Sequence, residues 1–154
     1  SALEIIKKAK ENNVDLILPI DSVNSTTFNN QSASSVSEIN KIPANEMGLD
    51  IGPKSIDLFS KEILSSKTIL WNGPMGVFEF SNFSEGTLSV GKSICESTEK
   101  GAFSLVGGGD SIAAIKKFNL TNGISYISTG GGAFLEFVEG KSLPAVAALE
   151  ARQQ

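Results

Sequence analysis

Short, uninterrupted apolar runs mark the strands that we expect in this chain. They occupy residues 16–20, 68–71, 103–107 and 125–128. An uninterrupted run, as opposed to an alternating one, is typical of a strand covered on both faces, the usual environment of a parallel sheet. The pattern therefore predicts a mostly parallel sheet.

Helical periodicity fills the stretches around and between these runs. Apolar residues recur at helical spacing in residues 2–12, 53–65, 85–99 and 111–118, and we expect a last helix from Pro144. Alternation of strands and helices is typical of an α/β fold.

Residues 22–40 depart from this pattern because they are polar and rich in Ser and Asn. Such a composition fits a disordered loop, but β-branched residues such as Val23 and Val36 also allow a small antiparallel excursion. We favour the excursion and expect it over residues 22–42.

Composition fits one ordinary domain and excludes several kinds of partner. The 154 residues are 40% hydrophobic and carry a net charge of −4, and no basic stripe suggests a nucleic-acid partner. The single cysteine cannot form a disulfide within the chain, and no apolar run approaches the roughly 20 residues of a membrane span. With no visible signal peptide, we expect a cytoplasmic protein and no membrane partner.

Histidine is absent from the chain. This removes the commonest general base and any nucleophile activated by histidine. If the chain serves an enzyme, its chemistry needs little acid–base catalysis. Phosphoryl transfer, which depends mainly on positioning and electrostatics, meets that condition.

A first glycine-rich junction, "GGGDS" at residues 107–111, follows an expected strand and precedes an expected helix. Glycines allow a tight turn, and the unpaired N–H groups of a helix start attract anions. We expect the helix to start near Asp110 or Ser111, with Asp110 either capping it or binding Mg²⁺ together with phosphate oxygens.

A second junction, Gly130–Gly132, follows the next strand and carries no carboxylate. It suits an anion without a metal. Two such junctions on successive parallel strands would lie at the same sheet edge, where open α/β sheets bind ligands. The alternative is that both sets of glycines only form turns.

A third stretch, residues 68–80, leads from a strand into a Gly- and Pro-containing turn and then to Phe78 and Glu79. An apolar surface beside one carboxylate suits a nucleoside, with Glu79 accepting hydrogen bonds from ribose hydroxyls. The alternative is that Phe78 and its aromatic neighbours belong to the core and Glu79 is solvated. The chain contains no Walker loop. It has no G-x-G-x-x-G motif either, and the strand at 125–128 does not end in an acidic residue, so NAD binding is disfavoured.

Four segments, in this order, resemble the phosphoglycerate kinase family: "MGLDIGPKSIDLF", "WNGPMGVFEF", "GGGDS" and "STGGGAFLEFVEGKSLPAVAAL". The family, a group of glycolytic kinases, transfers the acyl phosphate of 1,3-bisphosphoglycerate to MgADP and yields 3-phosphoglycerate and ATP. The resemblance implies an α/β, Rossmann-like three-layer domain. It further implies that residues 1–154 are part of the nucleotide-binding C-terminal domain.

The resemblance also implies roles for individual residues. Those that would line the adenine site are Gly48 and Leu49. Those that would line the rest of the nucleoside pocket are Asn72, Gly73, Pro74 and Phe78, with ribose held by Glu79. Those that would meet the phosphates are Gly108, Gly109, Asp110 and Ser111, with Mg²⁺ reached by Asp110. Those that would stabilise the phosphoryl group in flight are Gly130, Gly131 and Gly132.

The resemblance further implies that this sequence is a fragment. We expect the N-terminal domain, which binds 3-phosphoglycerate and 1,3-bisphosphoglycerate, to be absent, together with the family's nucleotide-binding lysine. We therefore expect a fragment that is inactive alone and that either self-associates or is marginally stable, from a parent enzyme that is a monomer. The alternative is a non-catalytic module that binds a nucleotide or another anion.

Overall fold

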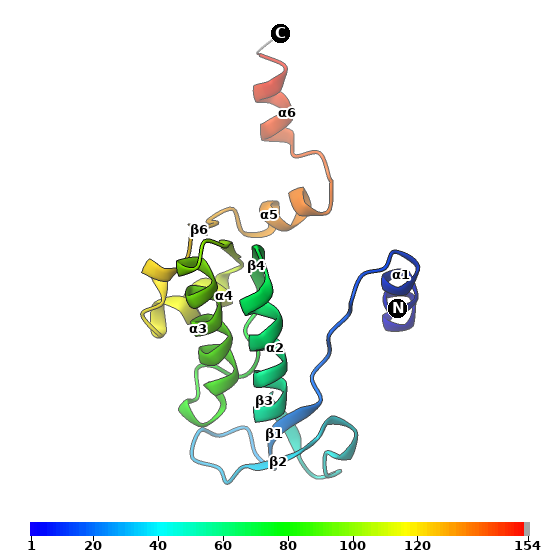
Figure 1. The fold of residues 1–154 in the computed structure, drawn as a ribbon, viewed down its shortest axis with the longest axis vertical. Helices are drawn as coiled ribbons and strands as arrows, with labels where there is room; N and C mark the ends of the chain where they lie inside the picture. The colour runs from blue at the N-terminus through cyan, green and yellow to red at the C-terminus, as the bar shows by residue number, and fades with distance from the viewer. Residues whose placement is uncertain (153–154) are drawn as a thin grey trace.

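The computed structural model describes residues 1–152 as a mixed α/β structure with two separate three-stranded sheets (Figure 1). The helices are α1 (Ala2–Glu11), α2 (Pro53–Ser65), α3 (Glu85–Glu99), α4 (Gly109–Lys117), α5 (Gly131–Val138) and α6 (Pro144–Glu150). The strands are β1 (Asp21–Ser25), β2 (Ser35–Glu38), β3 (Met47–Ile51), β4 (Thr68–Asn72), β5 (Phe103–Gly107) and β6 (Tyr126–Ile127). Short 3₁₀ turns occupy Ile39–Lys41, Ser81–Phe83 and Thr121–Gly123.

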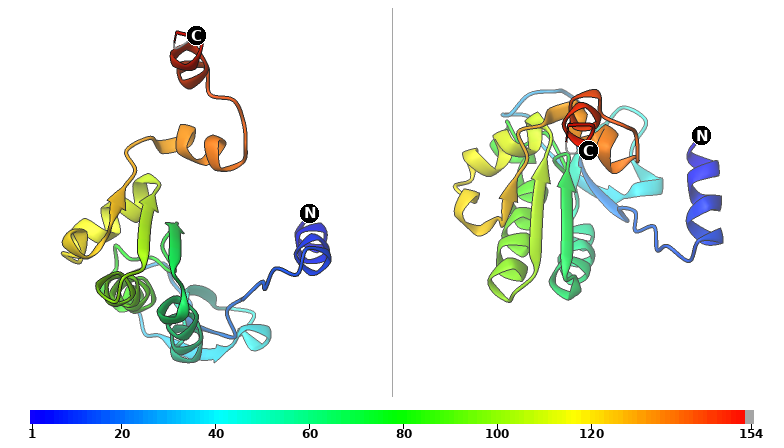
Figure 2. Two further views of the ribbon diagram at one scale, coloured as in Figure 1. Left: turned by 45° about the horizontal axis from the view of Figure 1, so that its top comes forward. Right: turned by 90° about the horizontal axis from the view of Figure 1, so that it is seen from above.

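The larger part of the fold is built on a parallel sheet of order β4-β5-β6. One face of this sheet, with Trp71 and Val106, packs against apolar residues of α2, α3 and α4, including Ile94 and Ile115. These residues form the hydrophobic core, and α2 and α3 lie side by side over it (Figures 1 and 2). The strands expected at 68–71, 103–107 and 125–128 are confirmed.

The opposite face of the parallel sheet is only partly covered. α5 lies against this face: its Phe134 lines one pocket together with Leu105 of β5 and Tyr126 of β6. Leu70 and Phe103 remain 47% and 49% exposed. The arrangement is that of an incomplete Rossmann-like domain with helices on both faces of a parallel sheet, which confirms the expected fold class.

A small antiparallel sheet of order β2-β1-β3 lies at the ends of α2 and α3 (Figure 1). β1 pairs with both neighbours, and its pairing with β3 shifts register between Val23 and Asn24. Within residues 22–42, β1 and β2 pair antiparallel, residues 26–34 form the loop that joins them, and a 3₁₀ turn follows β2. The mostly parallel sheet expected from sequence is thus joined by a second sheet of equal strand number.

The strand expected at 16–20 is wrong. Residues 14–19 form no strand within the described chain; they run in an extended path from α1 to β1, and Leu18 is 55% exposed (Figure 1). A strand requires a neighbour that offers its backbone groups. Ile20 O accepts from Ile39 N–H at 3.0 Å, and ladder pairing begins only at Asp21, opposite Glu38 of β2.

The two terminal helices project from the body of the fold (Figures 1 and 2). Neither α1 nor α6 has a buried residue. α1 begins with a capping box in which Glu4 N–H donates to Ser1 Oγ at 3.4 Å. Across residues 1–152, none of the helices has the length and apolar character needed to cross a membrane.

Candidate functional site

The loops that follow β4 and β5 lie next to each other at one edge of the parallel sheet. The last residues of these strands, Asn72 and Gly107, are paired in the ladder. Beyond them, Gly73 N–H donates to Ser111 Oγ at 2.7 Å. Gly108 has φ +90°, and a Cβ atom there would lie 2.5 Å from Asn72 Oδ1. The positive φ would strain any other residue here, so Gly108 permits the close approach of the two loops.

The start of α4 differs from the sequence prediction. Gly108, and not Asp110, is the N-cap residue, and no side chain caps the helix. The first bond of the helix runs from Ile112 N–H to Gly108 O at 3.1 Å. The positive φ of Gly108 starts the helix earlier than a capping aspartate would. Asp110 consequently lies in the first turn with an exposed side chain.

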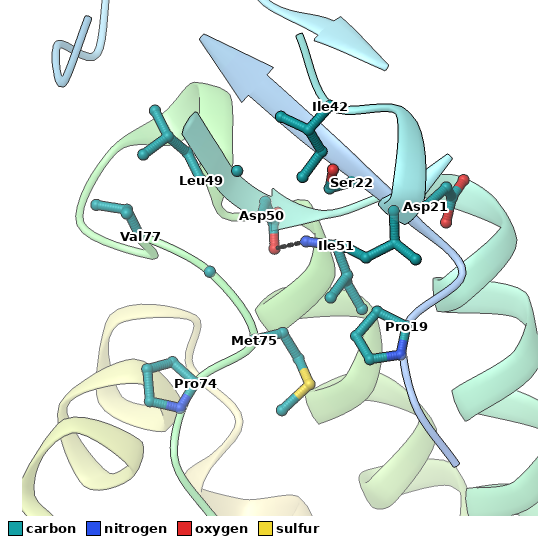
Figure 3. A pocket seen from close by; sticks show the side chains of 13 residues that line it. Pro19, Asp21, Ser22, Ile42, Leu49, Asp50, Ile51, Pro74, Met75 and Val77 are labelled. Atoms are coloured by element: carbon teal, nitrogen blue, oxygen red, sulfur yellow. Dashed lines mark hydrogen bonds between the residues drawn. The ribbon is translucent and has the colours of Figure 1, made fainter. Parts of the chain in front are cut away.

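An open pocket of about 390 Å³ lies between the antiparallel sheet and the loop after β4 (Figure 3). Its lining includes Gly48, Leu49 and Pro74. Val77 adds an apolar wall, and its N–H donates to Leu49 O at 2.8 Å. Three residues expected at a nucleoside site therefore share one pocket.

Asp50 lines this pocket and joins β3 to the first turn of α3. Its Oδ1 accepts from Ile51 N–H at 2.9 Å (Figure 3). Its Oδ2 accepts from Gly86 N–H, in the first turn of α3, at 2.8 Å. A Cβ atom at Gly76 or Gly86 would collide with this carboxylate. Burial raises the pKa of Asp50 to about 6. The nearby negative charge of Glu85 also raises it, whereas the hydrogen bonds from Gly86 and Ile51 oppose the rise.

Asp21 accepts hydrogen bonds from the first turn of α2, as Asp50 does from the first turn of α3. Its Oδ1 accepts from Ser55 N–H at 2.8 Å, and its Oδ2 accepts from Lys54 N–H at 3.0 Å. Burial alone would raise the pKa of Asp21, but the hydrogen bonds from Ser55 and Lys54 and the charge of Lys54 lower it below its ordinary value. The two buried aspartates thus hold the starts of the two helices that frame the core.

Phe78 and Glu79 have different environments. Phe78 is buried and Glu79 is exposed. The ammonium of Lys117, in the last turn of α4, donates to the Phe78 oxygen at 2.8 Å and to the Glu79 oxygen at 2.9 Å. Trp71 belongs to the hydrophobic core, as the alternative interpretation of these aromatic residues expects for it.

The third predicted segment, Gly130–Gly132, follows β6 and opens α5. Gly131 has φ +53°, and no atom lies within 4 Å of a Cβ built there. Of the three glycines, Gly130 lines an apolar groove of about 550 Å³ with Phe134 and Phe137. Within residues 1–152 no hydrogen bond joins these glycines to the loops after β4 and β5. The segment follows β6 at the same edge of the sheet, and Phe134 of α5 lies against Gly107 at the end of β5.

Metal ligands are few in the described part of the chain. It holds no group of three or more His, Cys, Asp or Glu side chains that could bind a metal ion. Asp110 offers one exposed carboxylate beside the open start of α4. A single carboxylate suits Mg²⁺ that takes its other ligands from phosphate oxygens and water. The donor set therefore fits a metal that arrives with a nucleotide.

Sequence reasoning missed Asp50, Thr87 and Lys117. Thr87 Oγ1 accepts from Met75 N–H at 3.0 Å and so holds the middle of the loop after β4. A signal for Asp50 was present, because a carboxylate between the apolar residues Leu49 and Ile51 needs partners when buried. No sequence signal identified Lys117, whose partners are backbone atoms.

Comparison with known proteins gives a consistent result. The family model described as phosphoglycerate kinase matches residues 1–141. Phosphoglycerate kinase of Porphyromonas gingivalis (strain W83) is 56% identical over 149 residues, which are 97% of this chain and 36% of the relative. That of Chlorobium phaeobacteroides (strain BS1) is 49% identical over 148 residues, 96% of this chain and 37% of the relative. The chain spans a little over a third of the length of these relatives.

Solved structures agree in shape as well as in sequence. Phosphoglycerate kinase from Coxiella burnetii is 44% identical, with a TM-score of 0.89 over 95% of this chain and 37% of the other. That from Pyrococcus horikoshii is 33% identical, with a TM-score of 0.75 over 97% of this chain and 37% of the other.

Proposed function

This chain belongs to the phosphoglycerate kinase family, and from that membership we propose that it supplies part of the nucleotide site of a glycolytic kinase. The reaction is the reversible transfer of the acyl phosphate of 1,3-bisphosphoglycerate to ADP. An oxygen of the terminal phosphate of ADP attacks the phosphorus, the bond to the acyl oxygen breaks, and the carboxylate of 3-phosphoglycerate leaves. The observation that carries the proposal is the hydrogen bond from Gly73 N–H to Ser111 Oγ, which joins the loop after β4 to the first turn of α4.

The nucleotide is proposed to lie across these two loops. Gly48, Leu49 and Pro74 would contact the base in the pocket of Figure 3. The exposed carboxylate of Glu79 would accept hydrogen bonds from the ribose hydroxyls. Asn72 and Gly73, at the adjoining strand end, would complete the nucleoside site. Buried Phe78 would support it from the core side.

The phosphates are proposed to meet the start of α4. The N–H groups of Gly109, Asp110 and Ser111 precede the first bond of the helix, so they are available to an anion. Gly108 permits the close approach of backbone and ligand. Asp110 would hold Mg²⁺, which would neutralise charge on the phosphate oxygens. The start of α5, at Gly130–Gly132, would stabilise the transferring phosphoryl group from the next strand end.

Several related statements remain proposals. The second substrate would bind to the rest of the parent protein, and this chain alone would bind nucleotide without turnover. A cytoplasmic location, a monomeric parent and the absence of a nucleic-acid partner stay predictions of the sequence.

Replacement of Asp110 by alanine tests the site. We expect Asp110→Ala to weaken MgADP binding by roughly tenfold, because one charge-assisted contact is lost. ADP binding in the presence of a chelator should change much less. Isothermal titration of the purified chain with and without Mg²⁺ measures both affinities. Asp57→Ala, an exposed carboxylate on α2, is the matched control. An unchanged effect of Mg²⁺ on ADP affinity would exclude the metal role of Asp110.

A further inference from the structure

A single ammonium group fixes the backbone on both sides of Glu79. Lys117 Nζ donates to the carbonyl oxygens of Phe78 and Glu79, two consecutive peptide groups, at 2.8 and 2.9 Å. These peptides flank the Cα atom of Glu79. Holding both planes restricts the φ and ψ angles of Glu79 and therefore the direction in which its side chain leaves the backbone.

The same helix also holds the opposite end of this loop. Ser111, in the first turn of α4, accepts the Gly73 N–H, whereas Lys117 ends α4 and holds the peptides of Phe78 and Glu79. Between these points, Met75 is held by Thr87 of α3. The loop from Gly73 to Glu79 is therefore attached to α4 at both of its ends.

We propose that Lys117 is a positioning residue of the nucleotide site, which orients Glu79 toward the ribose hydroxyls and links that end of the site to the phosphate-binding start of α4. The inference rests on the proposed function, because it requires that Glu79 faces ribose. Charge is part of the device, since an ammonium donor makes stronger bonds to carbonyl oxygens than a neutral donor does. The side chain of the adjacent Lys116 is exposed and makes no hydrogen bond or ion pair within the described chain, so it offers a matched control.

The test compares ADP with 2′,3′-dideoxyADP, which lacks both ribose hydroxyls. We expect the unmodified chain to prefer ADP, and we expect Lys117→Met to reduce that preference by about threefold to tenfold. Affinity for 2′,3′-dideoxyADP should change little. Lys116→Met should keep the preference of the unmodified chain. Lys117→Arg, which keeps a charged donor able to reach two carbonyls, should restore most of it.

Glu79→Gln shows whether Lys117 acts through Glu79. Alone, Glu79→Gln should lower the preference as Lys117→Met does, and the double variant should lose little more. Amide exchange of residues 77–80 should be faster in Lys117→Met than in Lys116→Met, which gives a readout that needs no ligand.

The outcomes separate the two hypotheses. If the unmodified chain prefers ADP and Lys117→Met keeps that preference, the positioning role is wrong and the proposed function survives. If the unmodified chain binds neither compound, the proposed function fails for this chain and the inference fails with it. If it binds ADP and 2′,3′-dideoxyADP equally, Glu79 does not bind the ribose hydroxyls, and the positioning role of Lys117 is likewise overturned.

Discussion

Asp21 and Ser55, which are 34 residues apart in the chain, exchange hydrogen bonds in both directions. Ser55 N–H and Ser55 Oγ donate to Asp21 Oδ1 at 2.8 and 2.6 Å, and Asp21 N–H donates to Ser55 Oγ at 3.0 Å. Strand β1 and the first turn of α2 thereby satisfy each other's buried polar groups.

Replacement of Asp21 should therefore destabilise the chain. We expect Asp21→Ala to lower the free energy of unfolding by about 1–3 kcal/mol, because a helix cap and a buried hydrogen-bond acceptor are lost together. Urea denaturation followed by far-UV circular dichroism measures the change. Asp57→Ala, an exposed position on the same helix, should cost less than about 0.5 kcal/mol. Equal effects of the two replacements would contradict this role.

Asp21 should also contribute to the pH dependence of stability. Its pKa is lower in the folded chain than the ordinary value of 3.8. The folded state therefore binds fewer protons than the unfolded state in that range, and this contribution to stability is lost as the pH falls below 3.8. In Asp21→Asn, this part of the acid destabilisation should disappear.

Asp50 should give a pH dependence of the opposite sign. Its pKa rises from 3.8 to about 6 on folding, so the folded state keeps a proton that the unfolded state has already lost. The free energy of unfolding should therefore fall as the pH rises from 3.8 to about 6. Asp50→Asn, which cannot ionise, should abolish this decline. Urea midpoints on both sides of that range measure it. An unchanged slope in Asp50→Asn would show that Asp50 is not its source.

Gly131 and Gly132 should respond differently to substitution. A Cβ atom meets nothing within 4 Å at either position, but only Gly131 has a positive φ, +53°. Gly131→Ala should therefore strain the start of α5 by roughly 1–2 kcal/mol, whereas Gly132→Ala should be neutral or slightly stabilising. Amide exchange within α5 measures both effects.

In the full-length parent, Gly131→Val should lower turnover more than it lowers nucleotide affinity. Contacts to charge that develops during transfer affect kcat in particular. Comparison of kcat with the dissociation constant for MgADP decides the matter. If thermal stability and turnover fell in parallel, Gly131 would serve only the backbone conformation at the start of α5.

The open edge of β4 should cause self-association of this chain. Among the described residues 1–152, β4 has a ladder partner on one side only, and its Leu70 is 47% exposed. Unpaired strand edges invite pairing with a second chain, and charges discourage it. Leu70→Lys should therefore reduce the apparent mass in light scattering. Leu64→Lys, on the surface of α2, is the control and should leave the mass unchanged. A monodisperse monomer before any substitution would contradict the prediction.

Local pattern was sufficient to predict most elements. The helices expected at 53–65 and 85–99 have those bounds in the structure, because helical periodicity and Pro53 at the first helical position act over a few residues. The failure at 16–20 has a different origin. An apolar run indicates a segment suited to burial, but burial and pairing both require a neighbouring strand, and here Leu18 stays 55% exposed.

The same distinction applies to the candidate site. The glycines of the two strand ends were found because they carry a local pattern, and the structure brings Gly108 against Asn72. Asp110 was expected as a possible cap, yet the helix starts earlier in the chain, with Gly108 as the N-cap residue at a positive φ. Asp50 and Lys117 act on residues 36 and 38 or more positions away. No local pattern encodes such partners.

The dependence of α2 and α3 on aspartates from another sheet has a consequence for the order of folding. Neither helix has a capping side chain of its own at its N-terminus. Each receives its acceptor only when a loop of more than 30 residues has closed. Isolated peptides of 53–65 and 85–99 should therefore fray at their first turns. In the chain, the two helices and the antiparallel sheet should consolidate in one late, cooperative step, and the rate of that step should be set by loop closure and not by helix propagation.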